Sequence, residues 1–197
     1  MIEIGKLNAF HRETTQAWHA ELELFAVELP WSAIEENHAQ NFRLWHEEDV
    51  ARRRDVGDAR IVEAKRNIDV FNQARNNAME RVDDWLLGEL ARRGVESAVG
   101  ALHSETPGMM IDRLSIMALK EFHMVEQTLR SDADEAHRVK CAARVEVLRE
   151  QQSDLSEALR VLLAELPGGR RRFKVYRQFK MYNDPALNPQ LYGVRAR

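Results

Sequence analysis

A chain of 197 residues with 44% apolar and 31% charged residues, but only nine glycines and five prolines, has the composition of one all-α domain. It contains no run of 18 apolar residues and its start lacks the pattern of a signal peptide, so we expect a cytoplasmic protein without a membrane span. The single cysteine, Cys141, excludes an intramolecular disulfide and a zinc site built from several cysteines.

The net charge of −3 is unevenly distributed along the chain. Residues 170–197 contain eight Lys or Arg and one Asp, a local charge of +7, which leaves −10 for residues 1–169. We expect this basic segment either to pack on the acidic body of the protein or to reach an anionic partner. The acidic body and the lack of a recognisable nucleic-acid motif argue against nucleic acid as that partner.

Apolar residues at helical spacing predict two helices before the first turn. The first covers about residues 3–29 and ends at Pro30, which cannot continue a helix. The second covers about residues 32–54, and the Arg-Asp-Val-Gly-Asp sequence at residues 54–58 then predicts a turn.

The third predicted helix, about residues 58–90, has apolar residues at alternating steps of three and four, with Arg75 at one of these apolar positions. The fourth follows Thr106 as N-cap and Pro107 as first helical residue. Eleven of the 17 residues from 109 to 125 are apolar and leave no broad polar face, which is typical of a helix inside a bundle.

The fifth helix is predicted over about residues 133–166 and is ended by Pro-Gly-Gly at 167–169. Cys141 occupies its apolar stripe, so we expect a small buried residue rather than a nucleophile. Four aromatics then recur every third residue between basic residues: Phe173, Tyr176, Phe179 and Tyr182. The chain is thus predicted to be an antiparallel bundle of about five helices, residues 1–169, with a basic-aromatic C-terminal extension, residues 170–197, packed on it within the same domain.

Polar residues interrupt the apolar stripes of the second, third and fourth helices, and if these helices are neighbours the polar groups converge inside the bundle. We therefore predict an interior pocket for an anionic small molecule, because Arg and Lys bind phosphate or carboxylate groups. The ligand-binding candidates are Lys65, Asn72, Arg75, Arg113, Lys120 and His123. The candidates for orienting the ligand or transferring protons, the catalytic set, are His46, Asp49, Asp69 and Asp112. The alternative is a self-satisfied network of salt bridges that fixes the register of the helices.

A metal site is a further alternative. Glu35 and His38 form a Glu-x-x-His element and His46 and Asp49 a His-x-x-Asp element, but a di-iron bundle needs two Glu-x-x-His elements. A metal-dependent hydrolase would use His38, His46 and Asp49. The preferred interpretation assigns no metal ligand and names no cofactor.

Four sequence blocks resemble a bacterial family of domains of unknown function, the one numbered 4254. They are LWHEEDVAR at residues 44–52, KRNIDVFNQARN at 65–76, SETPGMMIDRLSIMALKEFHM at 104–124 and FKVYRQFKMYNDP at 173–185. The resemblance implies an all-helical protein whose gene often lies beside those for glycosyltransferases and cell-surface polysaccharide assembly. It implies no catalytic residue. It favours a role in cell-surface glycan metabolism, or alternatively a non-catalytic partner of a glycosyltransferase that docks through residues 170–197.

Overall fold

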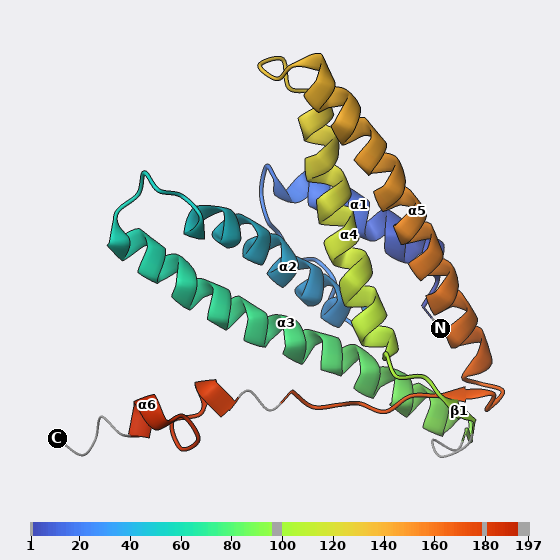
Figure 1. Ribbon diagram of the computed structural model, residues 1–197. Coiled ribbons are helices and arrows are strands. Elements are labelled where there is room, and N and C mark those ends of the chain that lie inside the picture. The colour runs from blue at the N-terminus through green and yellow to red at the C-terminus, as the bar shows by residue number, and fades with distance from the viewer. Residues whose placement is uncertain (1, 96–99, 179–180, 193–197) are drawn as a thin grey trace.

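The computed structural model describes residues 2–95, 100–178 and 181–192, and this part of the chain is almost entirely helical (Figure 1). Its α-helices are α1 (Ile4–Trp18), α2 (Trp31–Ala51), α3 (Asp58–Arg92), α4 (Pro107–Thr128), α5 (Glu135–Glu165) and the short α6 (Pro189–Tyr192). The predicted all-α fold is confirmed, and the ends of α2, α3 and α5 lie within three residues of their predicted positions. None of the described helices has the length and apolarity needed to cross a membrane.

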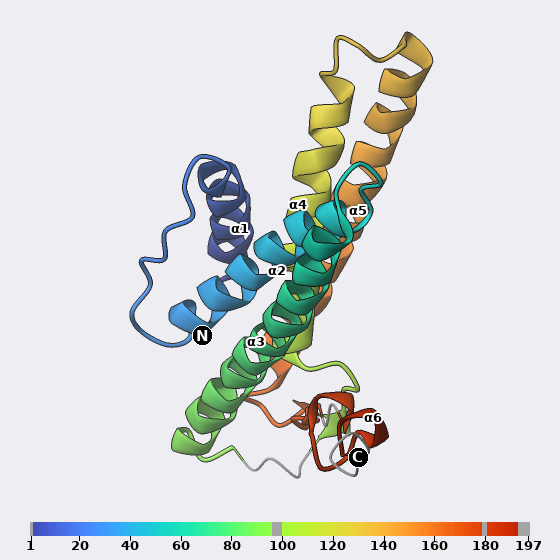
Figure 2. The same cartoon turned by 90° about the vertical axis from the view of Figure 1, so that its left-hand side faces the viewer.

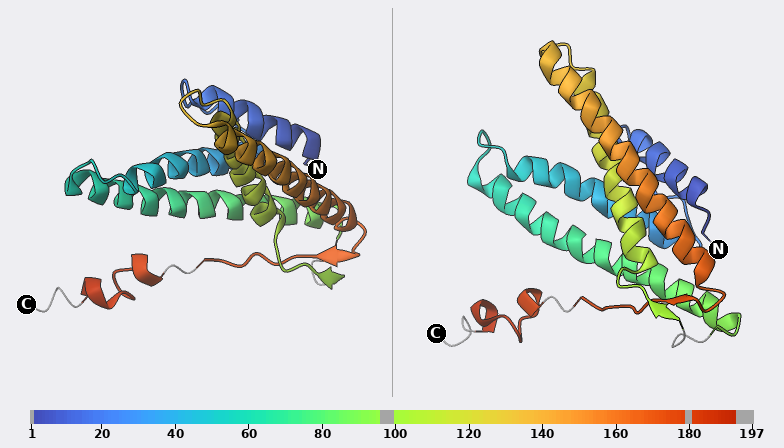
Figure 3. Two further views of the ribbon diagram at one scale, coloured as in Figure 1. Left: turned by 45° about the horizontal axis from the view of Figure 1, so that its top comes forward. Right: turned by 45° about the vertical axis from the view of Figure 1, so that its right-hand side comes forward.

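The long helices form two antiparallel hairpins, α2–α3 and α4–α5, which lie together at one end and diverge toward the other (Figures 1 and 3). Helix α1 lies against α4 and α5, to one side of the α2–α3 hairpin (Figure 2). Helix α4 contacts α1, α2, α3 and α5. The prediction that residues 109–125 form the inner helix is therefore confirmed, and Leu114 at its middle is fully buried.

The first helix is shorter than predicted, because it ends at Trp18 and not near Leu29. The connector to α2 has its own hydrogen-bond partners in a non-helical conformation. The buried Glu35 carboxylate accepts hydrogen bonds from the backbone N–H groups of Phe25 (3.0 Å) and Ala26 (2.8 Å). The indole N–H of Trp18 donates to the carbonyl of Glu23 at 3.0 Å. Apolar residues of the predicted stripe, such as Phe25, are consequently exposed.

Two very short parallel strands join the ends of the α4–α5 hairpin. Strand β1 (Ala101–Leu102) pairs with β2 (Arg171–Arg172), with Ala101 opposite Arg171. The two segments approach each other closely at Gly100, where a Cβ would lie 2.5 Å from the Gly169 carbonyl oxygen. The φ of Gly100 is +94°, a conformation that favours glycine. The chain therefore enters and leaves this hairpin at one point.

The start of α4 is fixed on α3. Thr106 caps the helix as predicted, because its side chain accepts a hydrogen bond from the Met109 N–H at 3.1 Å. The Gly108 N–H donates to the buried Asp83 carboxylate at 2.7 Å. Burial raises the pKa of Asp83 from 3.8 to about 6, although hydrogen bonds with Thr106 and Gly108 oppose the rise.

The raised pKa of Asp83 predicts a specific pH dependence of stability. Folding favours the protonated carboxyl, so between about pH 4 and pH 6 the folded protein binds more protons than the unfolded chain and its stability falls as the pH rises. Asp83→Asn removes this dependence while retaining an acceptor for Gly108. The free energy of unfolding of the variant, relative to the wild type, is expected to rise by about 2.4 kcal/mol between pH 4 and pH 7. Urea titrations at a series of pH values measure it, and parallel curves for the two proteins would contradict it.

Residues 170–178 of the basic C-terminal segment pack on the acidic body, as in the first of the two predicted options. Phe173 is buried in the main apolar core. Arg177 forms ion pairs with Glu80 and Asp84 of α3, both at 2.8 Å. Tyr176 is exposed. Phe179 and the side chain of Tyr182 lie outside the described residues.

Candidate functional site

An ion pair between the partly exposed Arg75 and the buried Asp112 connects α3 and α4 at the centre of the molecule. Arg75 Nε donates to Asp112 Oδ1 at 2.7 Å, and a second guanidinium nitrogen donates to Oδ2. The amides of Asn37 and Asn41 on α2 also donate to Oδ1, at 2.9 and 3.0 Å. The hydrogen bond to Asp112 raises the pKa of Arg75, so the guanidinium stays charged. With four donors around it, the Asp112 carboxylate is suited to joining three helices rather than to proton transfer.

The network continues from Asp112 to α1 through neutral groups. Asn41 donates to Ser115 Oγ at 2.9 Å, and Ser115 Oγ lies 2.7 Å from His38 Nδ1. His38 Nε2 lies 3.0 Å from Thr15 Oγ1. Burial, with the neighbouring His11, lowers the pKa of His38 well below 6.5, so the ring is neutral at pH 7. Both His38 nitrogens thus have partners inside the protein.

Several of the predicted interior residues lie on the surface instead, and Asp49 and Lys120 are exposed as well as the three described next. Lys65 and Asp69 form an i,i+4 ion pair of 2.7 Å on α3, with side chains 67% and 45% exposed. Arg113 pairs with Glu105 at 2.7 Å and is also exposed. Lys65 and Asp69 are exposed because the two hairpins diverge toward the N-terminal end of α3 (Figure 1). There α3 has α2 as its neighbour, and the outer face of α3 meets solvent. The structure therefore does not bring all of the predicted residues together in one place.

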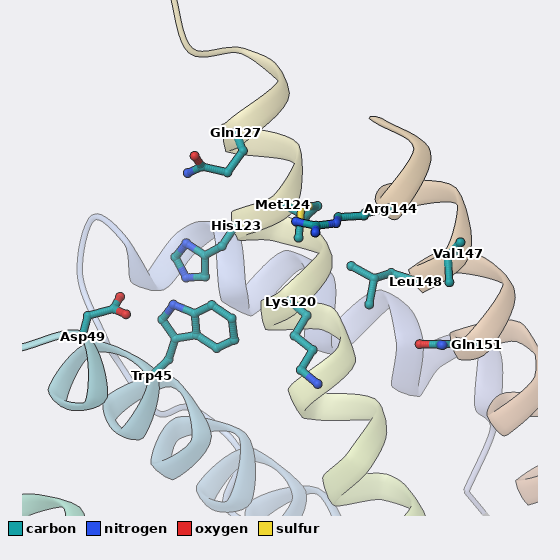
Figure 4. Close-up of a pocket in the computed structure, with 10 residues that line it drawn as sticks. All are labelled: Trp45, Asp49, Lys120, His123, Met124, Gln127, Arg144, Val147, Leu148 and Gln151. Atoms are coloured by element: carbon teal, nitrogen blue, oxygen red, sulfur yellow. The ribbon is translucent and has the colours of Figure 1, made fainter. Parts of the chain in front are cut away.

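Two clefts lie on either side of the C-terminal part of α2, and both are lined by Trp45 and Asp49. The predicted residues Asn72, Arg75, Lys120 and His123 each line one of them, whereas His46 and Asp112 line neither. The cleft toward α3 has a volume of about 320 Å³ and includes Asn72 and Arg75. The cleft toward α5, here named the α2–α4–α5 cleft, is larger, at about 680 Å³. It is lined by Trp45, Asp49, Lys120, His123, Met124, Gln127, Arg144, Val147, Leu148 and Gln151 (Figure 4).

The α2–α4–α5 cleft combines an apolar wall with two cations. Met124, Val147 and Leu148 supply aliphatic surface from α4 and α5. Trp45 stacks on His123, with ring centroids 4.7 Å apart and planes 9° apart. Figure 4 shows Arg144 extending from α5 toward α4, with Lys120 one turn before His123 on α4. Among the described residues neither Lys120 nor Arg144 forms an ion pair, so both charges are available to a ligand.

His46 and His123 meet a third histidine, His19, where the C-terminal end of α1 approaches α2 and α4. One ring nitrogen of each lies within 4.8 Å of the other two, and within the described part of the chain this is the one group of three or more such side chains with that spacing. The rings meet at angles of 62° to 72°. Burial lowers the pKa of His123, and the neighbouring His19 and His46 act in the same direction, while the hydrogen bond with Glu126 opposes the change. The alternative metal site, His38, His46 and Asp49, does not have this spacing among the described residues.

Sequence reasoning missed Arg144, His19 and the two asparagines that bind Asp112. Asn37 and Asn41 stand four residues apart on the buried side of α2, a spacing that could have marked them as partners for a buried charge. His19 was placed within a longer helix. Arg144 borders the apolar stripe of α5, where a solvated position was the ordinary expectation.

Two comparisons with known proteins, one with curated sequences and one with solved structures, found no match. The third comparison was with families. The family model described as "Protein of unknown function (DUF4254)" matches residues 31–175, which includes α2 to α5, and the chain belongs to this family.

Proposed function

We propose that the protein binds an anionic small molecule, phosphorylated or sugar-linked, in the α2–α4–α5 cleft, and that it acts in cell-surface glycan metabolism. The observation that carries the proposal is the pair of cations, Lys120 and Arg144, which have no acidic partner among the described residues and border an otherwise largely apolar cleft. Arg binds a phosphate or carboxylate through two hydrogen bonds, and Lys adds a point charge.

The rest of the cleft suits the uncharged part of such a ligand. Trp45 presents an indole held in place by His123, and aromatic rings of this kind pack against the apolar face of a sugar or a base. Asp49 and Gln127 supply acceptors and a donor for hydroxyl groups. A volume of about 680 Å³ lies within the range of small-molecule sites. The link to glycan metabolism comes from the family resemblance and guides the choice of ligands.

The proposal predicts loss of binding when the cations are removed. Wild-type protein is titrated by calorimetry with inorganic phosphate, glucose 1-phosphate, uridine diphosphate and neutral glucose. We expect at least one phosphorylated compound to bind and glucose not to bind. Lys120→Ala and Arg144→Ala are each expected to weaken binding by about 10- to 100-fold, because each removes one charge-assisted contact.

A matched control is Lys140→Ala, since Lys140 is an exposed cation of α5 outside the cleft. Its binding constant is expected to equal that of the wild type. Equal loss in Lys140→Ala and Arg144→Ala would show attraction to general surface charge, and an absence of binding by every phosphorylated compound would also contradict the proposal.

A further inference from the structure

The hydrogen bonds of His19, His46 and His123 decide which nitrogen of each ring is free. Nδ1 of His19 lies 2.7 Å from the Thr15 carbonyl oxygen, and Nδ1 of His46 lies 2.8 Å from the Phe42 carbonyl oxygen. A carbonyl only accepts, so both Nδ1 atoms carry the proton.

His123 has the same arrangement with a carboxylate. Its Nδ1 lies 2.7 Å from Glu126 Oε2 and donates to it. In the neutral form of each ring Nε2 is therefore unprotonated and has a free lone pair. Nε2 of His123 is buried and has no hydrogen-bond partner among the described residues. A buried acceptor without a donor costs free energy, so this nitrogen points to a ligand.

We propose that His19, His46 and His123 bind a divalent transition-metal ion, zinc in the first place, through their Nε2 atoms. Histidines that bind metals usually donate the other ring N–H to a backbone carbonyl or a carboxylate, which fixes the tautomer and the ring orientation. Each of these three rings has such a partner. Three imidazole ligands suit zinc, copper or nickel, whereas magnesium and calcium require oxygen ligands.

The distances fit an ion of this size. Zn–N bonds of about 2.0–2.1 Å place the nitrogens of a tetrahedral site about 3.4 Å apart. One ring nitrogen of each histidine lies within 4.8 Å of those of the other two. An inward shift of each by less than about 1 Å closes the difference, which small rotations of the side chains supply. His19 is exposed, so an ion can reach the group from solvent.

Three protein ligands leave one position of a tetrahedral ion open, the arrangement of catalytic rather than structural zinc sites. Because His123 also lines the α2–α4–α5 cleft, the ion would add positive charge beside it. The metal site does not depend on the anion-binding function, and the two are tested separately.

The test is metal binding by untagged full-length protein after treatment with a chelator. Zinc is titrated by calorimetry, and cobalt by its visible absorption, which is intense when the ion is tetrahedral. We expect one ion per chain for each metal. His19→Ala, His46→Ala and His123→Ala are each expected to weaken zinc binding by about 100-fold or more. His103→Ala changes a histidine near the other end of α4 and is expected to bind zinc as the wild type does.

A fourth variant tests the metal site without replacing a histidine, in case the histidine variants misfold. Glu126 is half exposed, so Glu126→Ala leaves the packing intact, yet it removes the acceptor of His123 and is expected to weaken zinc binding by about 10-fold. The proposal is overturned if the wild type binds neither zinc nor cobalt stoichiometrically, or if zinc binding persists unchanged in all three histidine variants.

Discussion

Replacing Asp112 with alanine is expected to lower the free energy of unfolding by about 3 kcal/mol. The change leaves the Arg75 guanidinium without its buried counter-ion and removes the acceptor of the Asn37 and Asn41 amides. Loss of one member of a buried pair costs more than the pair contributes, because the remaining charge stays desolvated. Arg75 is partly exposed, which keeps the effect near the lower end of the range for such changes. Chemical denaturation measures it directly.

Asp69→Ala is the matched control, because it removes a carboxylate from an ion pair on the surface of α3. An exposed i,i+4 pair contributes about 0.5 kcal/mol or less, and salt screens it. A similar loss in both variants would contradict the structural role assigned to Asp112. So would an Asp112→Ala protein of wild-type stability, and that result would revive proton transfer as the role of this carboxylate.

The second large effect is expected at Gly108, where α4 begins on the backbone of α3. A Cβ at this position would lie 2.5 Å from the Met79 carbonyl oxygen and 2.9 Å from the Asp83 carboxylate. The carbonyl belongs to a helix and cannot yield, so α4 must move and the hydrogen bond from Gly108 N–H to Asp83 is strained. Gly108→Ala is expected to cost about 3 kcal/mol. In a chain of this length that lowers Tm by about 6–12 °C, which calorimetry detects.

Gly88→Ala, in α3, is expected to change stability in the opposite direction from Gly108→Ala. Gly88 lies inside α3 with no atom within 4 Å of an added Cβ. Alanine there is expected to stabilise the protein by about 0.5–1 kcal/mol, because it restricts the unfolded chain and favours the helix. Equal destabilisation by the two substitutions would contradict close packing at Gly108 as the cause.

The long helices could be predicted from the sequence because their apolar periodicity extends over many turns and does not depend on distant residues. The connector after α1 could not be, since its conformation depends on a carboxylate at Glu35 that accepts hydrogen bonds from backbone groups nine and ten residues earlier. Propensity there is overridden by a tertiary contact.

The candidate site was predictable in part for a related reason. Arg75 and Asp112 stand out as charges within apolar segments, and they do bind each other. The burial of the other charged residues on α3 and α4 depends on the angle between the two hairpins. No local sequence pattern predicts that angle. The histidine group is harder still, because His19, His46 and His123 belong to three helices and share no sequence motif.

The pairing of β1 with β2 has a mechanical consequence for the α2–α4–α5 cleft. The backbone N–H groups of Ala101 and His103 donate hydrogen bonds to the carbonyl oxygens of Arg170 and Arg172. These bonds hold the segment before α4 and the segment after α5 together at one end of the hairpin. Lys120 and Arg144 both belong to this hairpin, whereas Trp45 and Asp49 belong to α2. A tilt of the whole hairpin relative to α2 would therefore change the width of the cleft and leave the spacing between the two cations unchanged.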